Sequence, residues 1–189
     1  MDRLRIINLQ ESDRLKNLLS IIRGNSPELI ESKDDIDFTG GAIVIACSEV
    51  HAGMSTWLLD QCIKFLRQGK SVLYLSWDGS NMSWLMSMMS AIAYEISLKT
   101  ASENLSEYAT RFQSEVGDKL NISLSHYCIE INDKFILIKE CIKDVDIIFI
   151  DGQCEPLDKL RRDTLKRLYG ILPQDKMLFI SCQVPLNKS

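Results

Sequence analysis

Residues 42–56 read AIVIACSEVHAGMST, an unbroken apolar run followed by a polar loop with a single glycine. An apolar run without alternation is typical of a strand buried on both faces of a parallel sheet. Directly after the loop, Leu58, Leu59, Cys62 and Leu66 fall on one stripe at helical spacing, which predicts a helix from about residue 53 to residue 68. This part of the chain is therefore predicted to form a strand, a loop and a helix, the repeating unit of α/β proteins.

The same alternation continues along the rest of the chain. Further strands are predicted at residues 71–76, 121–127, 145–150 and 177–181, and further helices at 82–98, 102–116, 132–143 and 157–170. Strands that alternate with helices imply right-handed crossover connections and parallel pairing. We therefore predict an α/β domain with a mostly parallel sheet covered by helices on both faces.

The first 39 residues are predicted to form an accessory extension. Leu4, Ile6 and Ile7 indicate a short strand, and Ser12 is placed to cap a helix with apolar residues at positions 15, 18, 19 and 22. Residues 25–37 are polar, contain a proline and carry several acids, as linkers do. The predicted organisation is an N-terminal extension and linker over residues 1–39 and one domain over residues 40–189.

Composition narrows the class of protein. The chain has 189 residues, with 22 Lys and Arg against 26 Asp and Glu and a formal net charge of −4, so it is not expected to coat nucleic acid through its overall field. No apolar run approaches the roughly 20 residues of a membrane span, and the N-terminal residues do not resemble a secretory signal. Six cysteines without zinc-site spacing indicate reduced thiols. We expect an intracellular protein, nuclear if its source is a eukaryote.

Polar residues follow three of the predicted strands, where parallel sheets bind their ligands. After the first strand, Gly53 and Ser55 match the second glycine and the hydroxyl of the phosphate-binding loop G-x-x-x-x-G-K-[ST]. Asp151 follows the strand at 145–150, in the pattern that holds Mg²⁺ in phosphate-loop proteins. Gln183 follows the last strand.

These motifs resemble those of the RecA-like ATPase superfamily, which includes recombinases, their paralogues, RadA and DnaB-type replicative helicases. Residues 53–59, GMSTWLL, resemble the G-K-S-T-L-L-L of that group, and residues 72–78, VLYLSWD, resemble its strand that ends in an acid. The resemblance covers roughly residues 38–185 and implies a RecA-like core. It implies Asp78 as general base, Asp151 as the magnesium ligand and Gln183 as the sensor of the γ-phosphate. The implied nucleotide-binding positions are Ser48, Gly53, Met54, Ser55 and Thr56.

The sequence departs from this pattern where the nucleotide would bind. Met54 stands in place of the lysine that contacts the phosphates, Ser48 replaces the first glycine, and Glu49 adds a negative charge. Losing one charge-assisted contact costs about 1.5–3 kcal/mol, and Asp78 is one methylene shorter than the glutamate of the family. We therefore expect no catalytic residues, with Asp78 and Gln183 as residual candidates. No cofactor is expected. ATP with Mg²⁺ would be bound only if the degenerate site has kept its affinity for them.

Three segments are candidates for contacts with other molecules. Trp84 and Met86 fall partly off the apolar stripe of their predicted helix, so they are candidates for an adaptable partner surface, although core filling is the default interpretation. The N-terminal strand is a candidate bridge to a neighbouring subunit, because a free strand can extend a partner's sheet; its apolar residues are Leu4, Ile6, Ile7 and Leu9. A basic cluster on the helix at 157–170 is either a solvated helix face or a patch for nucleic acid or an acidic partner; its members are Lys159, Arg161, Arg162, Lys166 and Arg167.

The leading hypothesis is a non-catalytic paralogue of RecA-type recombinases. Such a protein would be a subunit of a hetero-oligomer with an ATP-competent RecA-fold protein and would support recombinase filaments on single-stranded DNA in homologous recombination and DNA repair. One alternative is an atypical active NTPase that uses Asp78 and Asp151 and takes a lysine from elsewhere, either Lys70 or a partner. Another is a pseudo-ATPase regulator of a DnaB-type replicative helicase.

Overall fold

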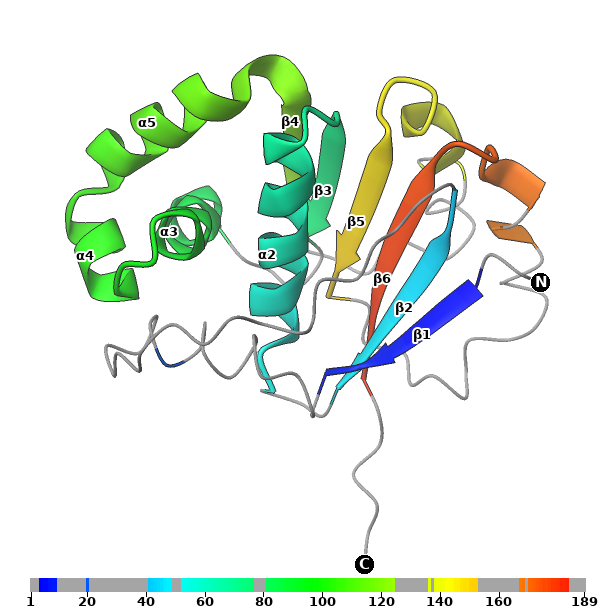
Figure 1. The fold of residues 1–189 in the computed structure, drawn as a ribbon, viewed down its shortest axis with the longest axis horizontal. Helices are drawn as coiled ribbons and strands as arrows, with labels where there is room; N and C mark the ends of the chain where they lie inside the picture. Colours follow the sequence, from blue (N-terminus) through cyan, green and yellow to red (C-terminus); the bar gives the residue numbers. More distant parts are fainter. Residues whose placement is uncertain are drawn as a thin grey trace, which may run out of the picture.

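The protein is an α/β structure built on one parallel sheet, as seen in the computed structural model (Figure 1). The structure describes residues 4–9, 20, 41–48, 52–76, 81–124, 136, 138–152, 167–168 and 170–183. The strands are β1 (Leu4–Asn8), β2 (Ile43–Ser48), β3 (Val72–Ser76), β4 (Leu120–Leu124), β5 (Ile147–Asp151) and β6 (Met177–Gln183). They lie in the order β1-β2-β6-β5-β3-β4. Every pairing between these strands is parallel, which confirms the predicted sheet.

The apolar runs of the sequence form the centre of the sheet. Every residue of β2, β3 and β5 is buried, and β5 and β6 lie side by side between β2 and β3. A strand buried on both faces has no solvated side, so its sequence does not alternate between apolar and polar residues. This explains why residues 42–47 and 147–150 contain no charged residue.

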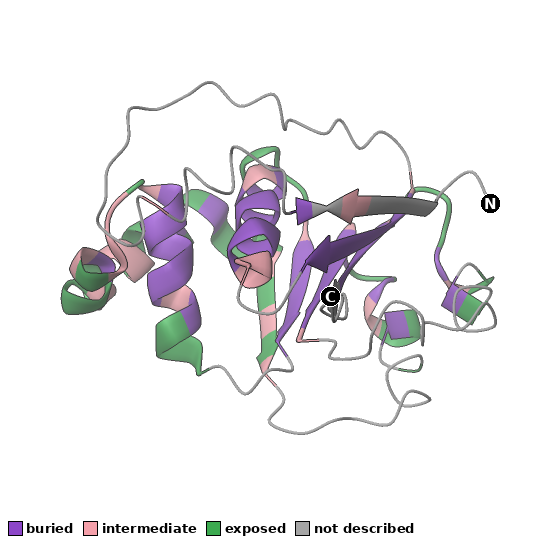
Figure 2. Ribbon diagram, turned by 90° about the horizontal axis from the view of Figure 1, so that it is seen from below, coloured by how far each residue is buried: buried purple, intermediate pink, exposed green. Residues whose placement is uncertain are grey.

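Helices cover both faces of the sheet, as predicted. One face packs against α2 (Met54–Arg67), α3 (Met82–Ala93) and α5 (Leu105–Val116), and we call the buried residues on this face the α2-side core. Within it the rings of Phe149 and Phe179 stack with centroids 4.5 Å apart. The opposite face packs against Ile138 and Leu168, which lie in two other helical segments, and against Ile142 and Leu172, which follow those segments. Figure 2 shows the buried strands, in purple, between these helices.

The N-terminal strand belongs to the main sheet. β1 pairs in parallel with β2, in a register that places Leu4 opposite Ile43 and Ile7 opposite Ala46. Leu9, just after β1, is 2% exposed and forms part of the α2-side core. The extension expected over residues 1–39 therefore contributes its strand to the domain expected over residues 40–189. The predicted helix after Ser12 and the predicted linker lie outside the described residues, apart from Ser20.

The helix predicted at 82–98 is shorter in the structure, and a separate short helix follows it. α3 ends at Ala93, and α4 (Leu98–Glu103) begins after Ser97, whose hydroxyl accepts a hydrogen bond from Thr100 N at 3.1 Å. Glu95 lies between them with a φ of 53°, a left-handed conformation that a helix cannot contain. The chain turns there, so that α5 packs back against α3. A short 3₁₀ turn, η2 (Gly117–Lys119), then leads from α5 into β4. In the part of the chain that is described, no helix has the length and apolar character needed to cross a membrane.

Candidate functional site

Four buried polar residues gather where the central strands end. Ser48 on β2, Ser76 on β3, Asp151 on β5 and Ser181 on β6 are each at most 3% exposed. The register pairs Ser76 with Asp151 and sets Ser181 opposite Ala46, two residues before the end of β2. We call these four residues the strand-end cluster. Because the strands are parallel, the cluster lies at the edge of the sheet where such folds bind ligands.

All four members lie on the face of the sheet that α2 covers. Successive side chains of a strand point to opposite faces, so residues two positions apart share a face. Ser76 and Asp151 stand two residues after Tyr74 and Phe149, which belong to the α2-side core. The same spacing relates Ser48 to Ala46 and Ser181 to Phe179. Alternation along the strands therefore places four polar groups between the sheet and α2.

Tyr74 satisfies the carboxylate of this cluster. Its hydroxyl donates a hydrogen bond of 2.8 Å to Asp151 Oδ2, and both groups are buried. Next to them, Gly152 N donates to Ser181 Oγ at 3.0 Å, and Gly152 has a φ of 92°, in the region that favours glycine. Ser181 thus holds the turn that follows β5, and Tyr74 holds the Asp151 carboxylate. A carboxylate with a buried donor on one oxygen serves first as a structural acceptor.

Sequence reasoning missed Tyr74, Ser76 and Ser181 as members of this site. Ser76 and Ser181 are polar residues at the ends of predicted strands, and this was a signal available in the sequence. Tyr74 sits within an apolar strand, and its role depends on β3 lying next to β5. That neighbourhood is not visible in any local pattern.

The segment that resembles a phosphate-binding loop makes a glycine turn at the start of α2. Gly53 is the N-cap residue with φ 89° and ψ 25°, a left-handed conformation that its missing Cβ permits. Its carbonyl accepts the first helical hydrogen bond, from Trp57 N at 3.0 Å. Thr56 is buried, whereas Met54 and Ser55 are half-buried. The predicted positions 53–56 therefore lie beside the strand ends, and the intervening residues 49–51 are outside the described part.

Met54 packs inward. It is a half-buried residue in contact with the α2-side core. The lysine of a phosphate-binding loop would direct a charge toward phosphates, whereas a thioether packed on apolar groups offers neither charge nor donor. The position is thus used for packing.

Lys70 lies at the wrong end of the sheet to replace that lysine. It is exposed in the turn before β3, and its N–H donates to Phe65 O near the end of α2. Six residues of extended strand separate it from Ser76, which corresponds to roughly 20 Å. A lysine side chain cannot cover that distance, so Lys70 of the same chain does not reach the strand-end cluster.

The remaining predicted site residues are only partly described. Asp78 lies outside the described residues, as do Lys159, Arg161, Arg162 and Lys166. Gln183 is the register partner of Ser48, and Arg167 is exposed on a helical segment. Within the described residues, no group of three or more His, Cys, Asp or Glu side chains is arranged to hold a metal ion.

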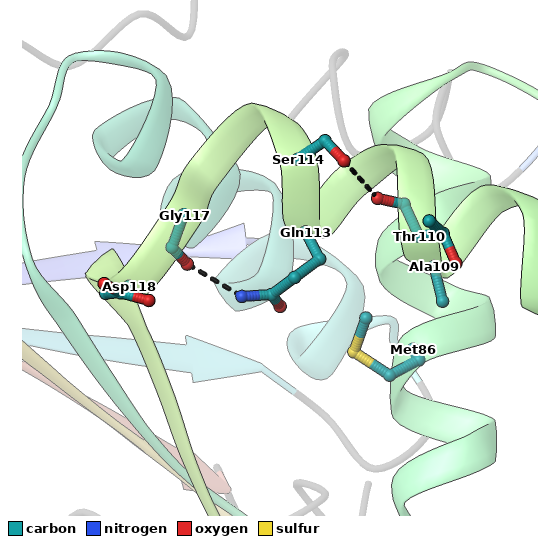
Figure 3. Close-up of a pocket in the computed structure, with 7 residues that line it drawn as sticks. All are labelled: Met86, Ala109, Thr110, Gln113, Ser114, Gly117 and Asp118. Atoms are coloured by element: carbon teal, nitrogen blue, oxygen red, sulfur yellow. Dashed lines mark hydrogen bonds between the residues drawn. The ribbon is translucent and has the colours of Figure 1, made fainter.

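The predicted partner residues fall into two places. On α3, Trp84 is 37% exposed and Met86 is half-buried, and Met86 lines an open groove of about 560 Å³ between α3 and α5 (Figure 3). On the N-terminal segment, Ile7 is half-buried and Leu9 is buried; the side chains of Leu4 and Ile6 are not described. Because β1 pairs with β2 of its own chain, it is not a free strand.

The sequence has no match among protein-family models, and no curated protein matches it.

Proposed function

We propose that this protein is a non-catalytic, RecA-like subunit of a protein complex, whose partner is an ATP-competent RecA-fold protein. In this role it would support recombinase filaments on single-stranded DNA in homologous recombination and repair. The α/β fold with a parallel sheet is compatible with the proposal. The choice of a recombinase partner rests on the sequence motifs at residues 53–59, 72–78, 150–151 and 183.

The observation that carries the non-catalytic part is the bond between Tyr74 and Asp151. A magnesium ligand needs carboxylate oxygens that face the metal or its waters. Asp151 is 3% exposed, and one of its oxygens accepts from the Tyr74 hydroxyl at 2.8 Å. Together with the inward packing of Met54, this favours a site that supports the fold over one that binds Mg²⁺ and ATP.

Nucleotide chemistry is the first test of this proposal. The purified chain is incubated with ATP and Mg²⁺, with and without single-stranded DNA, and released phosphate is measured next to binding of a fluorescent ATP analogue. We expect neither hydrolysis nor saturable binding. Hydrolysis that disappears in both Asp78→Asn and Asp151→Asn would contradict the proposal and support the atypical NTPase. The glycine turn at Gly53 is the structural feature on which such an enzyme would depend.

Partner identity is the second test. The tagged chain is co-expressed with RecA-type recombinases, with their ATP-competent paralogues and with a DnaB-type helicase, and stoichiometric complexes are weighed by light scattering. A complex with a recombinase or paralogue supports the proposal. A complex with the helicase alone moves the same non-catalytic role to replication, and failure to bind any RecA-fold ATPase refutes the proposed partner class.

A further inference from the structure

A groove lies between α3 and α5 and includes no member of the strand-end cluster. Met86 reaches into it from α3, and the facing wall is formed by α5 and the turn after it (Figure 3). That wall consists of Ala109, Thr110, Gln113, Ser114, Gly117 and Asp118. The groove thus has an apolar side on α3 and, on α5, a side lined by small and polar residues.

The apolar side extends beyond the groove along α3. Met82 lies one helical turn before Met86, on the same side of the helix, and is 42% exposed. Among the described residues the exposed large apolar side chains are Met82, Trp84 and Ile136, so two of them stand in the first turn of α3. Exposed apolar groups gathered beside a groove mark a contact surface more often than scattered ones do.

The polar side of the groove is already satisfied internally. Gln113 Nε2 donates to Gly117 O at 2.8 Å, and Ser114 Oγ donates to Thr110 O at 2.9 Å. These groups therefore do not require a polar ligand. What the groove offers to a partner is apolar contact with the methionines and the charge of Asp118.

The end of the groove is negative and uncompensated within the described residues. The C-terminal end of a helix carries partial negative charge, and α5 has no basic residue in its last turn. Asp118 follows directly and adds a full negative charge, without an ion pair in the described part of the chain. The adjacent Lys119 is directed elsewhere, since its Nζ lies 3.5 Å from where a Cβ on Gly69 would be, at the end of α2. Asp118 and the end of α5 repel each other, and a cation from a partner molecule would offset this repulsion.

We propose that the groove between α3 and α5 binds a basic amphipathic helix of a partner protein. Apolar side chains of that helix pack on Met82 and Met86, and a Lys or Arg of the same helix pairs with Asp118. Helices seat in grooves through apolar residues spaced three or four positions apart, and a flanking charge fixes their direction. The inference deepens the proposed function, because a non-catalytic subunit acts only through a surface that holds its partner.

The experiment uses the full chain and a fluorescently labelled helical peptide made only of Leu and Lys at amphipathic spacing. The matched probe replaces every Lys with Glu, and fluorescence anisotropy reports binding of each. We expect the Lys peptide to bind and the Glu peptide not to bind. Asp118→Asn should weaken binding by about threefold or more. Thr110→Arg, which fills the groove with a bulky cation at an exposed position, should weaken it by about tenfold or more.

Glu107→Gln is the matched control, because Glu107 is an exposed acid on α5 that does not line the groove. Equal losses in Glu107→Gln and Asp118→Asn would mean general attraction to an acidic protein and would overturn the proposal. Binding of both peptides alike would also overturn it. So would a dimer of the chain that Thr110→Arg dissociates, because the occupant would then be a second copy. The nucleotide assay is independent of these measurements, so hydrolysis combined with groove-specific peptide binding would refute only the proposed function.

Discussion

Asp151 is an acid held almost entirely out of water. Its carboxylate accepts from Tyr74 Oη at 2.8 Å, and both residues lie under α2. A buried carboxylate that loses a donor keeps its desolvation cost without the compensating bond. The stability of the strand-end cluster therefore depends on the tyrosine hydroxyl more than on its ring, which would pack equally well in phenylalanine.

We predict that Tyr74→Phe lowers the free energy of unfolding by about 1–3 kcal/mol, because a buried acceptor loses its donor. Urea denaturation of Tyr74→Phe, Asp151→Asn and the double variant measures the coupling between the two groups. A coupling energy of zero would show that the bond contributes nothing, and the assignment of Asp151 to a structural role would fail with it.

Ser90, unlike Asp151, is a buried polar residue whose side chain makes no hydrogen bond within the described part of the chain. Its hydroxyl has no hydrogen-bond partner among the described residues, although the residue is fully buried in α3. We predict that Ser90→Ala raises the free energy of unfolding by about 1 kcal/mol, because an unsatisfied hydroxyl is removed. Thermal and urea unfolding check the value.

Ser87 offers a matched control in the same helix. It is also buried, but its hydroxyl donates to Ser83 O at 2.9 Å. Ser87→Ala and Ser90→Ala gain the same helix propensity, so the difference between them isolates the unsatisfied hydroxyl. If Ser87→Ala raises the free energy of unfolding as much as Ser90→Ala does, the gain comes from helix propensity alone.

β1 is an edge strand whose loss would expose the core. It covers β2, every residue of which is buried, and the chain then places Leu9 in the α2-side core. This arrangement argues that the N-terminal segment is required for the stability of the domain. It also limits the predicted role of this segment as a bridge between subunits, because the strand would have to leave β2 to join another sheet.

We predict that Leu9→Ala lowers the free energy of unfolding by about 2–5 kcal/mol, as truncation of a fully buried leucine does. The half-buried Leu105 on α5 is the comparison, and Leu105→Ala should cost less. Chemical denaturation measures both. If Leu9→Ala unfolds like the wild type, residues 1–39 form the separable extension that the sequence suggests.

One hydrogen-bonded junction joins three strands at the amino end of the sheet. Asp146 Oδ2 accepts from Ser71 N at 2.9 Å and from Ser71 Oγ at 3.0 Å, and Lys176 Nζ lies 3.4 Å from Asp146 Oδ1. The hydrogen bond from the backbone N–H of Ser71 is the main reason why the pKa of Asp146 lies below its usual value of 3.8. The Ser71 hydroxyl and Lys176 lower this pKa further. The residues before β3, β5 and β6 are thus tied together across the molecule.

This junction makes the stability of the whole protein depend on pH. Because the folded pKa of Asp146 lies below the unfolded one, its contribution is fully present above the unfolded pKa and is lost as the pH falls through the folded pKa. We predict that Asp146→Asn is less stable than the wild type at neutral pH and that the difference shrinks in acid below about pH 4. Urea midpoints measured across this range test the sign.

Asp144 supplies the comparison for the acid titration, because it is an exposed acid two residues away. Asp144→Asn should differ little from the wild type in stability, as exposed charges contribute little. If the difference in stability between Asp146→Asn and the wild type does not change with pH, the junction does not couple protonation to folding.

Local pattern predicted the fold and part of the site. The strands and helices were found because burial on two faces and helical stripes leave periodic signatures in a few consecutive residues. The same signatures placed Ser48 and Asp151 at strand ends. The helix predicted over 82–98 was too long, because the apolar stripe continues past Ala93 whereas the left-handed Glu95 and the cap at Ser97 interrupt the backbone.

The order of apolar and polar residues was enough to establish the α/β class, the parallel sheet, its helical cover and the glycine turn before α2. Each of these depends on residues that are close in the sequence. Strand order and register were not accessible in this way: β1 joins β2, and β5 joins β3, which brings Tyr74 to Asp151 across 77 positions of the chain. Only packing in three dimensions gives Asp151 its buried donor, because Tyr74 comes from a neighbouring strand and no local pattern encodes that neighbour.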